Sequence, residues 1–181
     1  MKDMTQANLR SAFGGESQAR NRYDIWGDVA TKDGFPNVGR LFHCTADAEK
    51  VHANLHFKAM KDVKGDFLVA SMAGFGIGTT SENLEAAKGG EVFEYTEMYP
   101  AYIEVAEMQG EEAAVRAMRF AVAAEKVHAE LFGKAKEVVD SGKDLDDGKI
   151  YLCPVCGFVS LTGEEDKCPI CGAKKEVFVE Y

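Results

Sequence analysis

The sequence contains the same six-residue segment twice, and each copy carries a Glu-x-x-His motif. AEKVHA at residues 48–53 returns 76 residues later at 124–129. A second echo lies upstream, where GGE at 14–16 recurs at 89–91. Each half of the chain therefore offers one isolated glutamate followed, 33 or 34 residues later, by a Glu/His pair. Matched halves of this kind predict a duplicated helical hairpin with a two-metal site.

Apolar residues recur at three- and four-residue steps along most of the chain, which is the period of helices with one buried face. Gly34 and Gly110 interrupt the pattern, and Pro36 suits the first turn of a helix. The glycine-rich segment 65–81 is long enough, at roughly 55 Å when extended, to cross a bundle whose helices are about 40 Å long. We predict helices over 4–32, 36–63, 81–110 and 111–140.

The cysteines divide the chain into two domains. Four of the five lie in the last 29 residues, and a polar linker over 141–148 precedes them. Short strands are expected around the cysteine loops, at 149–152 and 176–181. We therefore predict a mainly α protein, with a four-helix bundle and long crossover over 1–146 and a small β and loop domain over 147–181.

The net charge and the apolar segments limit the kinds of partner that the protein can bind. A net charge of −9, without a cluster of Lys and Arg, argues against a nucleic-acid surface. The N-terminus has no apolar signal segment, and the longest apolar run, 67–78, is too short and glycine-rich to span a bilayer. We expect a cytoplasmic protein that binds no membrane, where paired C-x-x-C motifs indicate a metal site rather than disulfides.

The duplicated motif supplies a set of metal ligands. Residues i and i+3 lie on the same face of a helix, so the Glu and the His of each Glu-x-x-His can bind the same metal ion. Di-iron carboxylate bundles use one Glu from each of two helices and a Glu-x-x-His from each of the others. A single such motif is usually a solvated charge pair, but apolar neighbours beside both copies favour burial, and five buried carboxylates need cations. The predicted ligands are Glu16, Glu49, His52, Glu91, Glu125 and His128, with Glu94 as a seventh.

Several residues near these ligands leave alternatives open. The two glycine pairs indicate close packing or a local backbone bulge, or a plain helix irregularity. Tyr23 and Tyr99 each lie two turns after an isolated glutamate. They either donate hydrogen bonds to the ligating carboxylates or only pack in the core. His56, one turn beyond His52, lies near the site or is a packing residue, and Cys44 is read as a buried small side chain.

The two cysteine knuckles at the end of the chain predict a tetrahedral four-thiolate site. Taken alone, the pair fits a structural zinc ribbon as well as iron. An attached redox-capable bundle favours iron, because it would accept electrons from such a centre. The ligands are Cys153, Cys156, Cys168 and Cys171.

Together, the segment GESQARNRY at 15–23, the stretch EVFEYTEMYP at 91–100, both Glu-x-x-His pairs and the knuckles resemble the rubrerythrin family over nearly the whole chain. The resemblance implies a ferritin-like four-helix domain with two non-haem irons and a rubredoxin-like domain with one iron on four cysteines, which zinc can replace in recombinant protein. It also implies that the two metal sites of one chain lie far apart, so that electrons pass between subunits of a homodimer, head-to-tail or domain-swapped.

The resemblance further implies a role for each ligand. Glu49 and Glu125 would bridge the irons, Glu16 and Glu94 would complete one, and Glu91 with His128 the other. His52 would replace Glu94 in the reduced state. The candidate catalytic residues are Glu94, His52, Tyr23 and Tyr99.

The implied activity is that of a peroxidase in oxidative-stress defence, reducing hydrogen peroxide to water. Electrons would come from an external NAD(P)H-dependent reductase or a rubredoxin, because the chain has no nicotinamide or flavin motif of its own. A ferroxidase, iron-handling or oxygen-reducing role is the alternative, and a non-enzymatic zinc protein is a third hypothesis.

Overall fold

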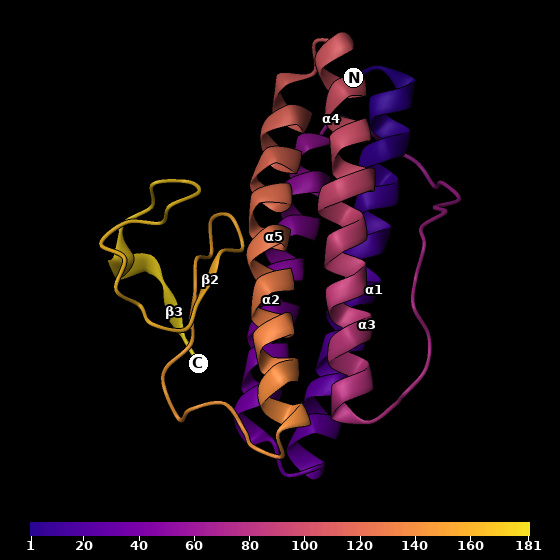
Figure 1. The fold of residues 1–181 in the computed structure, drawn as a ribbon. Coiled ribbons are helices and arrows are strands. Elements are labelled where there is room, and N and C mark those ends of the chain that lie inside the picture. Colours follow the sequence, from indigo (N-terminus) through magenta and orange to yellow (C-terminus); the bar gives the residue numbers. More distant parts are fainter.

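A computed structural model describes all residues from Met1 to Tyr181. The helices α3, η1 and α4 continue one another as one rod, so that four rods form a bundle (Figure 1). The predicted four-helix bundle is therefore confirmed. Its helices are α1 (Asp3–Lys32), α2 (Pro36–Ala59), α3 (Thr80–Phe93), the π-helix η1 (Glu94–Met98), α4 (Tyr99–Met108) and α5 (Glu112–Asp140).

The bundle consists of two hairpins, each closed by a glycine. Gly34 follows α1 and Gly110 follows α4, with positive φ angles of 95° and 72° that favour glycine. Pro36 opens α2, as predicted. That helix ends at Ala59 rather than at 63, because the amides of Met60 and Lys61 bond to carbonyls three residues back and so tighten the chain into turns.

Two apolar clusters fill the bundle. One is built on Tyr23, Trp26, Phe42 and Phe132, whose ring centroids lie 5.2 to 6.2 Å apart. The other contains Tyr99, together with leucine, methionine and alanine side chains from α1, α4 and α5. One buried tyrosine in each cluster reaches toward the middle of the bundle, where the acidic residues lie.

The crossover between α2 and α3 runs along the outside of the bundle from one end to the other, as expected (Figure 1). The side chains of Ser11 and Trp26 in α1 donate hydrogen bonds to the carbonyls of Ala70 and Gly76, at 2.9 and 3.1 Å. A Cβ at Gly14 would lie 2.8 Å from Val69. The first glycine pair therefore permits close packing of the crossover on α1, one of the alternatives that the sequence left open.

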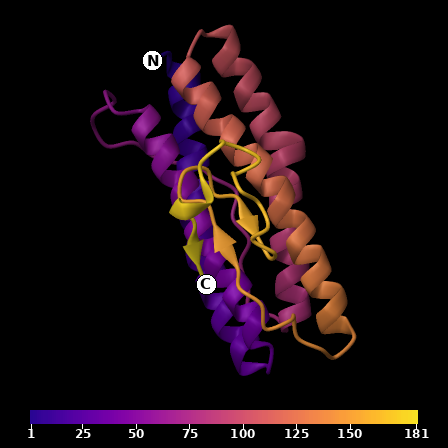
Figure 2. The ribbon, with the colours of Figure 1, turned by 90° about the vertical axis from the view of Figure 1, so that its left-hand side faces the viewer.

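The cysteine-containing segment folds as a small antiparallel sheet that lies across α2 and α5 (Figure 2). Its strands are β1 (Tyr151–Leu152), β2 (Val159–Ser160) and β3 (Val179–Glu180), in the order β2-β1-β3. Two strands fall within the predicted ranges and β2 was not predicted. Residues 175–177 form the 3₁₀ turn η2 (Lys175–Val177) rather than strand. Ile150, Leu152 and Val159 join the apolar cluster of the bundle.

The linker before this sheet is fixed to the bundle by its acidic side chains. Asp144 accepts hydrogen bonds from the amides of Asn37 and Val38, at 2.8 and 3.1 Å. These amides lie in the first turn of α2, where N–H groups have no hydrogen-bond acceptor within the helix. The N-terminus of a helix also favours a negative charge. Arg40 donates to the carbonyl of Gly148 at 2.9 Å. The linker therefore directs the sheet back along the bundle.

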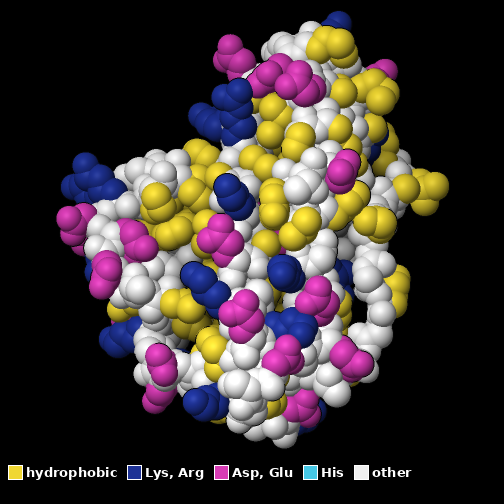
Figure 3. Space-filling view, viewed as in Figure 1, with side chains coloured by type: hydrophobic (Ala, Val, Ile, Leu, Met, Phe, Trp, Pro, Cys, Tyr) yellow, Lys and Arg dark blue, Asp and Glu magenta, His cyan; other side chains and the backbone are white.

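Basic and acidic side chains are interspersed on the face shown in Figure 3, without a patch of one sign. None of the helices is both long and apolar enough to cross a membrane.

Candidate metal centres

Six of the predicted ligands meet in the middle of the bundle. They form two groups of four, and within each group one ligand atom per residue lies within 4.8 Å of the others. Glu49 and Glu125 belong to both groups, which is the arrangement of bridging carboxylates. All six side chains are at most 1% exposed. The groups are Glu16, Glu49, His52 and Glu125, and Glu49, Glu91, Glu125 and His128.

The donor atoms fit two cations. One oxygen each of Glu16, Glu49 and Glu91 is buried and accepts no hydrogen bond. Buried carboxylate oxygens without partners are costly, and a divalent ion satisfies them. Carboxylate and imidazole donors together suit non-haem iron. The residues present therefore match the di-iron site predicted from the sequence.

Both histidines direct Nδ1 toward the carboxylates. His52 Nδ1 lies 2.6 Å from Glu125 and 3.2 Å from Glu49, and His128 Nδ1 lies 2.8 Å from Glu125. Burial opposes protonation, but Glu125 and Glu49 raise the pKa of His52 to about 10. The same two carboxylates, with Glu91, raise the pKa of His128. In the metal-free protein, protons on the imidazoles therefore balance charge that bound cations would otherwise balance.

The carboxylates respond to burial in two ways. Burial and neighbouring glutamates raise the pKa of Glu16, Glu91 and Glu94 well above the ordinary value. Burial also acts on Glu125, but His52 and His128 hold its pKa below the ordinary value. The bridging position thus carries negative charge even without metal, and the outer carboxylates favour the neutral acid until a cation replaces the proton.

The two tyrosines hold the isolated glutamates of the opposite halves. The hydroxyl of Tyr23 in α1 donates to Glu91 in α3, and the hydroxyl of Tyr99 in α4 donates to Glu16 in α1. Both rings are at most 1% exposed. The alternative in which the tyrosines donate to the carboxylates is therefore the one that the structure shows.

The structure does not bring Glu94 into either group of four. Glu94 is half-buried at the start of η1, where the helix widens to i→i+5 bonding. The sequence distance between equivalent residues of the two halves changes at this point. Glu16 and Glu91 are 75 residues apart, but Tyr23 and Tyr99 are 76 apart. One extra residue between Glu91 and Tyr99 is what a π-bulge accommodates. The predicted single helix over 81–110 did not include this insertion, although a local backbone bulge was one of the alternatives left open for the glycine pairs.

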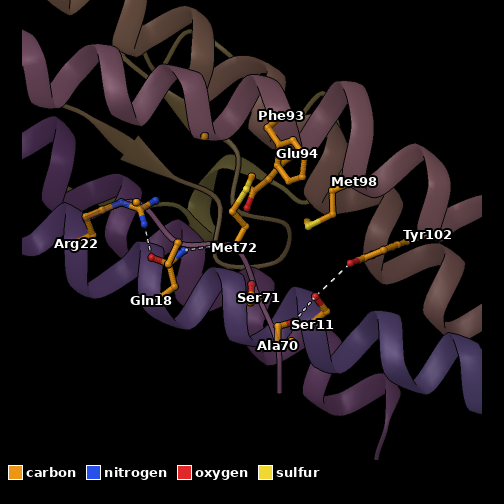
Figure 4. A pocket seen from close by; sticks show the side chains of 13 residues that line it. Ser11, Gln18, Arg22, Ala70, Ser71, Met72, Phe93, Glu94, Met98 and Tyr102 are labelled. Carbon is orange, nitrogen blue, oxygen red and sulfur yellow. Dashed lines mark hydrogen bonds between the residues drawn. The ribbon is translucent and has the colours of Figure 1, made fainter. Parts of the chain in front are cut away.

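A cavity of about 340 Å³ opens beside Glu94. Glu94 and Met98 line one side, Ser11 and Gln18 of α1 the other, and crossover residues 70–74 lie between them (Figure 4). The four other principal cavities contain no predicted ligand in their walls. Glu94 therefore connects the buried site to a space open to small molecules.

The four knuckle cysteines also converge. The Sγ atoms of Cys153 and Cys171 are 3.6 Å apart, and those of Cys156 and Cys168 are 3.4 Å apart. All four fall within 4.8 Å of one another, which fits a tetrahedral thiolate site for iron or zinc. Cys44 is buried elsewhere, and burial raises the pKa of its thiol to about 12, as expected for an inert small side chain.

The two candidate centres touch within one chain. His52 Nε2 donates to the carbonyl of Cys156 at 3.0 Å, and His128 Nε2 donates to the carbonyl of Gly157 at 2.9 Å. A Cβ at Gly157 would collide with the His52 ring, and its φ is 82°. These bonds fix the tautomer that leaves Nδ1 free to ligate. The expectation that the sites of one chain lie far apart is wrong here, because the anchored linker returns the knuckle to the bundle.

His56 is buried near the site. This was one of the two alternatives that the sequence left open for it. Its Nε2 lies 2.8 Å from the hydroxyl of Tyr99. Burial and the charge of His52 lower its pKa to about 3, so the ring is neutral. His43 instead lies at the surface beside Asp24, at 3.1 Å.

Comparison with known proteins agrees with this geometry. The family model described as Rubrerythrin matches residues 7–136. Rubrerythrin-2 of Clostridium acetobutylicum is 46% identical over 98% of this chain and 97% of its own length. Nigerythrin of Nitratidesulfovibrio vulgaris is 33% identical over 98% of this chain and 86% of its own. The solved structure of fully reduced, all-ferrous nigerythrin superposes with a TM-score of 0.90 at 32% identity, covering 100% of this chain and 88% of that one.

Proposed function

The chain belongs to the rubrerythrin family of di-iron redox proteins, and from this premise we propose that it is a peroxidase that reduces hydrogen peroxide to water. Each turnover would consume one peroxide, two electrons and two protons and release two waters. The observation that carries the proposal is the pair of hydrogen bonds from His52 and His128 to the cysteine knuckle. A site that drew electrons from iron as its substrate would have no use for this contact, which disfavours the ferroxidase alternative.

We assign the ligands by the two groups of four, with Glu49 and Glu125 shared between two irons and four cysteines holding a third. When bound, the paired irons supply Lewis acidity and electrons for cleavage of the O–O bond, and the cysteine-bound iron supplies the electrons that restore them. The protein contributes a dry site, because every grouped side chain is at most 1% exposed. Residues 1–146 would form the reacting domain and residues 147–181 the electron-transfer domain.

The remaining residues hold and orient the site. Carbonyls of the knuckle fix both imidazoles, and the two tyrosine hydroxyls hold Glu16 and Glu91. Rubrerythrins accept electrons from rubredoxin-type or reductase partners, and an NAD(P)H-dependent reductase would serve here. Reduced cysteine ligands suit the cytoplasm. A homodimer is compatible with this scheme but is not needed for the contact between the centres.

Stopped-flow mixing of the fully reduced protein with hydrogen peroxide, under anaerobic conditions, tests the proposal. Rapid reappearance of the visible band of the cysteine-bound iron is expected with peroxide, and slow reappearance with dioxygen. A faster response to dioxygen would instead favour an oxidase or ferroxidase. Absence of the band in every state would mean that the knuckles hold zinc.

Glu94→Ala is expected to reduce peroxide turnover by about 100-fold, the lower range for a group that handles protons in a reaction. Glu94 is the one candidate catalytic residue that lines the cavity shown in Figure 4, so an incoming peroxide meets it first. Helical content should be unchanged by circular dichroism. Glu97→Ala is the matched control, since Glu97 lies in the same π-helix but is exposed. Equal turnover in both variants would remove Glu94 from the mechanism.

Filling the cavity beside Glu94 is expected to slow the reaction with peroxide. Ala73 lines this cavity, and Ala73→Trp should lower the second-order rate constant by about tenfold, a barrier increase of about 1.4 kcal/mol. Leu68→Trp is the control, because Leu68 lies in the same crossover but is fully exposed. Stopped-flow rates and the association rate of azide with the oxidised protein measure access independently. Unchanged rates for Ala73→Trp would place the access route elsewhere.

A further inference from the structure

The site has two halves, one around Glu16 and one around Glu91, and they differ at a pair of equivalent positions that contact the tyrosines. Tyr23 holds Glu91 in one half, and Tyr99 holds Glu16 in the other. At the offset of 76 residues that relates the two Glu-x-x-His motifs, His56 corresponds to Phe132. Both side chains are fully buried and each packs beside the tyrosine of its half, with ring centroids 5.7 Å and 5.3 Å apart. Only the hydroxyl of Tyr99 therefore has a second hydrogen-bond partner besides its glutamate.

The hydrogen-bond roles around Tyr99 follow from counting protons. Its hydroxyl has one proton, which it donates to Glu16. When a cation is bound, Glu16 is ionised and cannot donate, so the contact of 2.8 Å with His56 runs the other way, with Nε2–H of His56 donating to the phenol oxygen. Nδ1 of His56 accepts no hydrogen bond. Because Nε2–H occupies a lone pair of that oxygen, the hydroxyl proton of Tyr99 is directed to Glu16.

The other half has no such restraint. Phe132 meets Tyr23 edge-on and carries no donor. The hydroxyl of Tyr23 reaches Glu91 without a second bond to its oxygen. Each group of four has one carboxylate besides the two shared ones, Glu16 in the group with His52 and Glu91 in the group with His128.

We propose that His56 is a positioning residue, which fixes the hydroxyl of Tyr99 on Glu16 and so holds this carboxylate in place in the group of four that contains His52. The inference rests on the ligand set proposed above. Hydrogen bonds in a chain polarise one another, so the donor at Nε2 also strengthens the bond from Tyr99 to Glu16.

The test compares three variants of the full-length protein. His56→Phe gives this half the residue found in the other half, His56→Gln keeps an N–H donor, and Phe132→Leu perturbs packing at the equivalent position. Carbon-13 spectra of ring-labelled tyrosine, in protein loaded with diamagnetic zinc, report the hydrogen bonding of Tyr99 and Tyr23 separately. Tyr99→Phe and Tyr23→Phe assign the two signals.

His56→Phe is expected to shift the phenol carbon of Tyr99 and leave that of Tyr23 unmoved, and His56→Gln should restore most of the shift. In iron-loaded protein, His56→Phe should slow the reaction with peroxide by about fivefold to tenfold, the factor that one hydrogen bond carries. The proposal would be overturned if the Tyr99 signal did not move in His56→Phe, or if Phe132→Leu shifted the Tyr99 signal by the same amount. The spectra do not depend on turnover, so wild-type protein that failed to react with peroxide would refute the proposed function alone.

Discussion

Removing iron from the bundle is expected to lower the melting temperature of the protein by about 15 to 30 °C at neutral pH. A ligand present at 1,000 times its dissociation constant stabilises the folded state by about 4 kcal/mol, so two ions contribute about 8 kcal/mol. For a chain of this size, each kcal/mol corresponds to about 2 to 4 °C. Calorimetry of loaded, chelated and reloaded protein measures the difference.

The same removal is expected to reverse the pH dependence of stability between pH 5 and 8. In the metal-free protein the pKa values of Glu16, Glu91 and Glu94 are raised, so their protons favour the folded state at low pH. That contribution is complete below the unfolded pKa and is lost as pH rises through the raised values. His52, with its pKa raised to about 10, acts in the same direction. His56, with its pKa lowered to about 3, acts in the opposite direction, but it is one group against four. The metal-free protein should therefore be more stable at pH 5 than at pH 8.

The loaded protein should show the opposite trend, because metal ions compete with protons for the same ligands and bind better as pH rises. The lowered pKa of Glu125 stabilises the fold above its unfolded value and matters only at more acidic pH. Chelated Cys153→Ser protein is the control for the cysteine site. Its stability should depend on pH in the same way as that of chelated wild-type protein, because the bundle ligands are the same. A metal-free protein that melts within a few degrees of the loaded one, or that gains stability toward pH 8, would contradict the assignment of these carboxylates to a metal site.

Sequence patterns were sufficient for the bundle and for most of the site because both depend on local periodicity. A Glu-x-x-His on a helix places its two side chains on one face whatever the partner helices are. The apolar neighbours of each motif then turn that face inward. The six grouped ligands and the four cysteines were therefore predictable.

Other features depend on contacts between distant segments. The return of the cysteine knuckle to His52 and His128 requires the linker, with Asp144 on the first turn of α2, and nothing local to Cys156 indicates it. The position of Glu94 outside both groups depends on the π-helix. That insertion was readable only from the change in offset between the halves, a comparison of distances rather than of residues. His56 was recognisable only as a neighbour of His52, since its bond to Tyr99 joins two helices.

Cys153→Ser should abolish the visible band of the cysteine-bound iron and lower reductase-coupled turnover by more than about 100-fold, because even outer-shell partners of metal ligands account for about 10- to 100-fold. One turnover of protein reduced chemically beforehand should be much less affected than coupled turnover, since the bundle ligands are untouched and only the knuckle carbonyls that orient His52 and His128 are disturbed. Cys44→Ser is the matched control: its thiol lies outside the four-cysteine group and should affect neither colour nor turnover.

A mixture of variants decides whether electrons pass within one chain. Glu125→Ala should disable the bundle site while leaving the cysteine site intact. The bonds from His52 and His128 to the knuckle join the two centres of a single chain, so Cys153→Ser protein refolded together with Glu125→Ala protein should remain inactive in the reductase-coupled assay. Recovery of turnover in the mixture would mean that a knuckle of one subunit serves the bundle of another. The contact seen here would then be made between subunits, through an exchange of the cysteine domain.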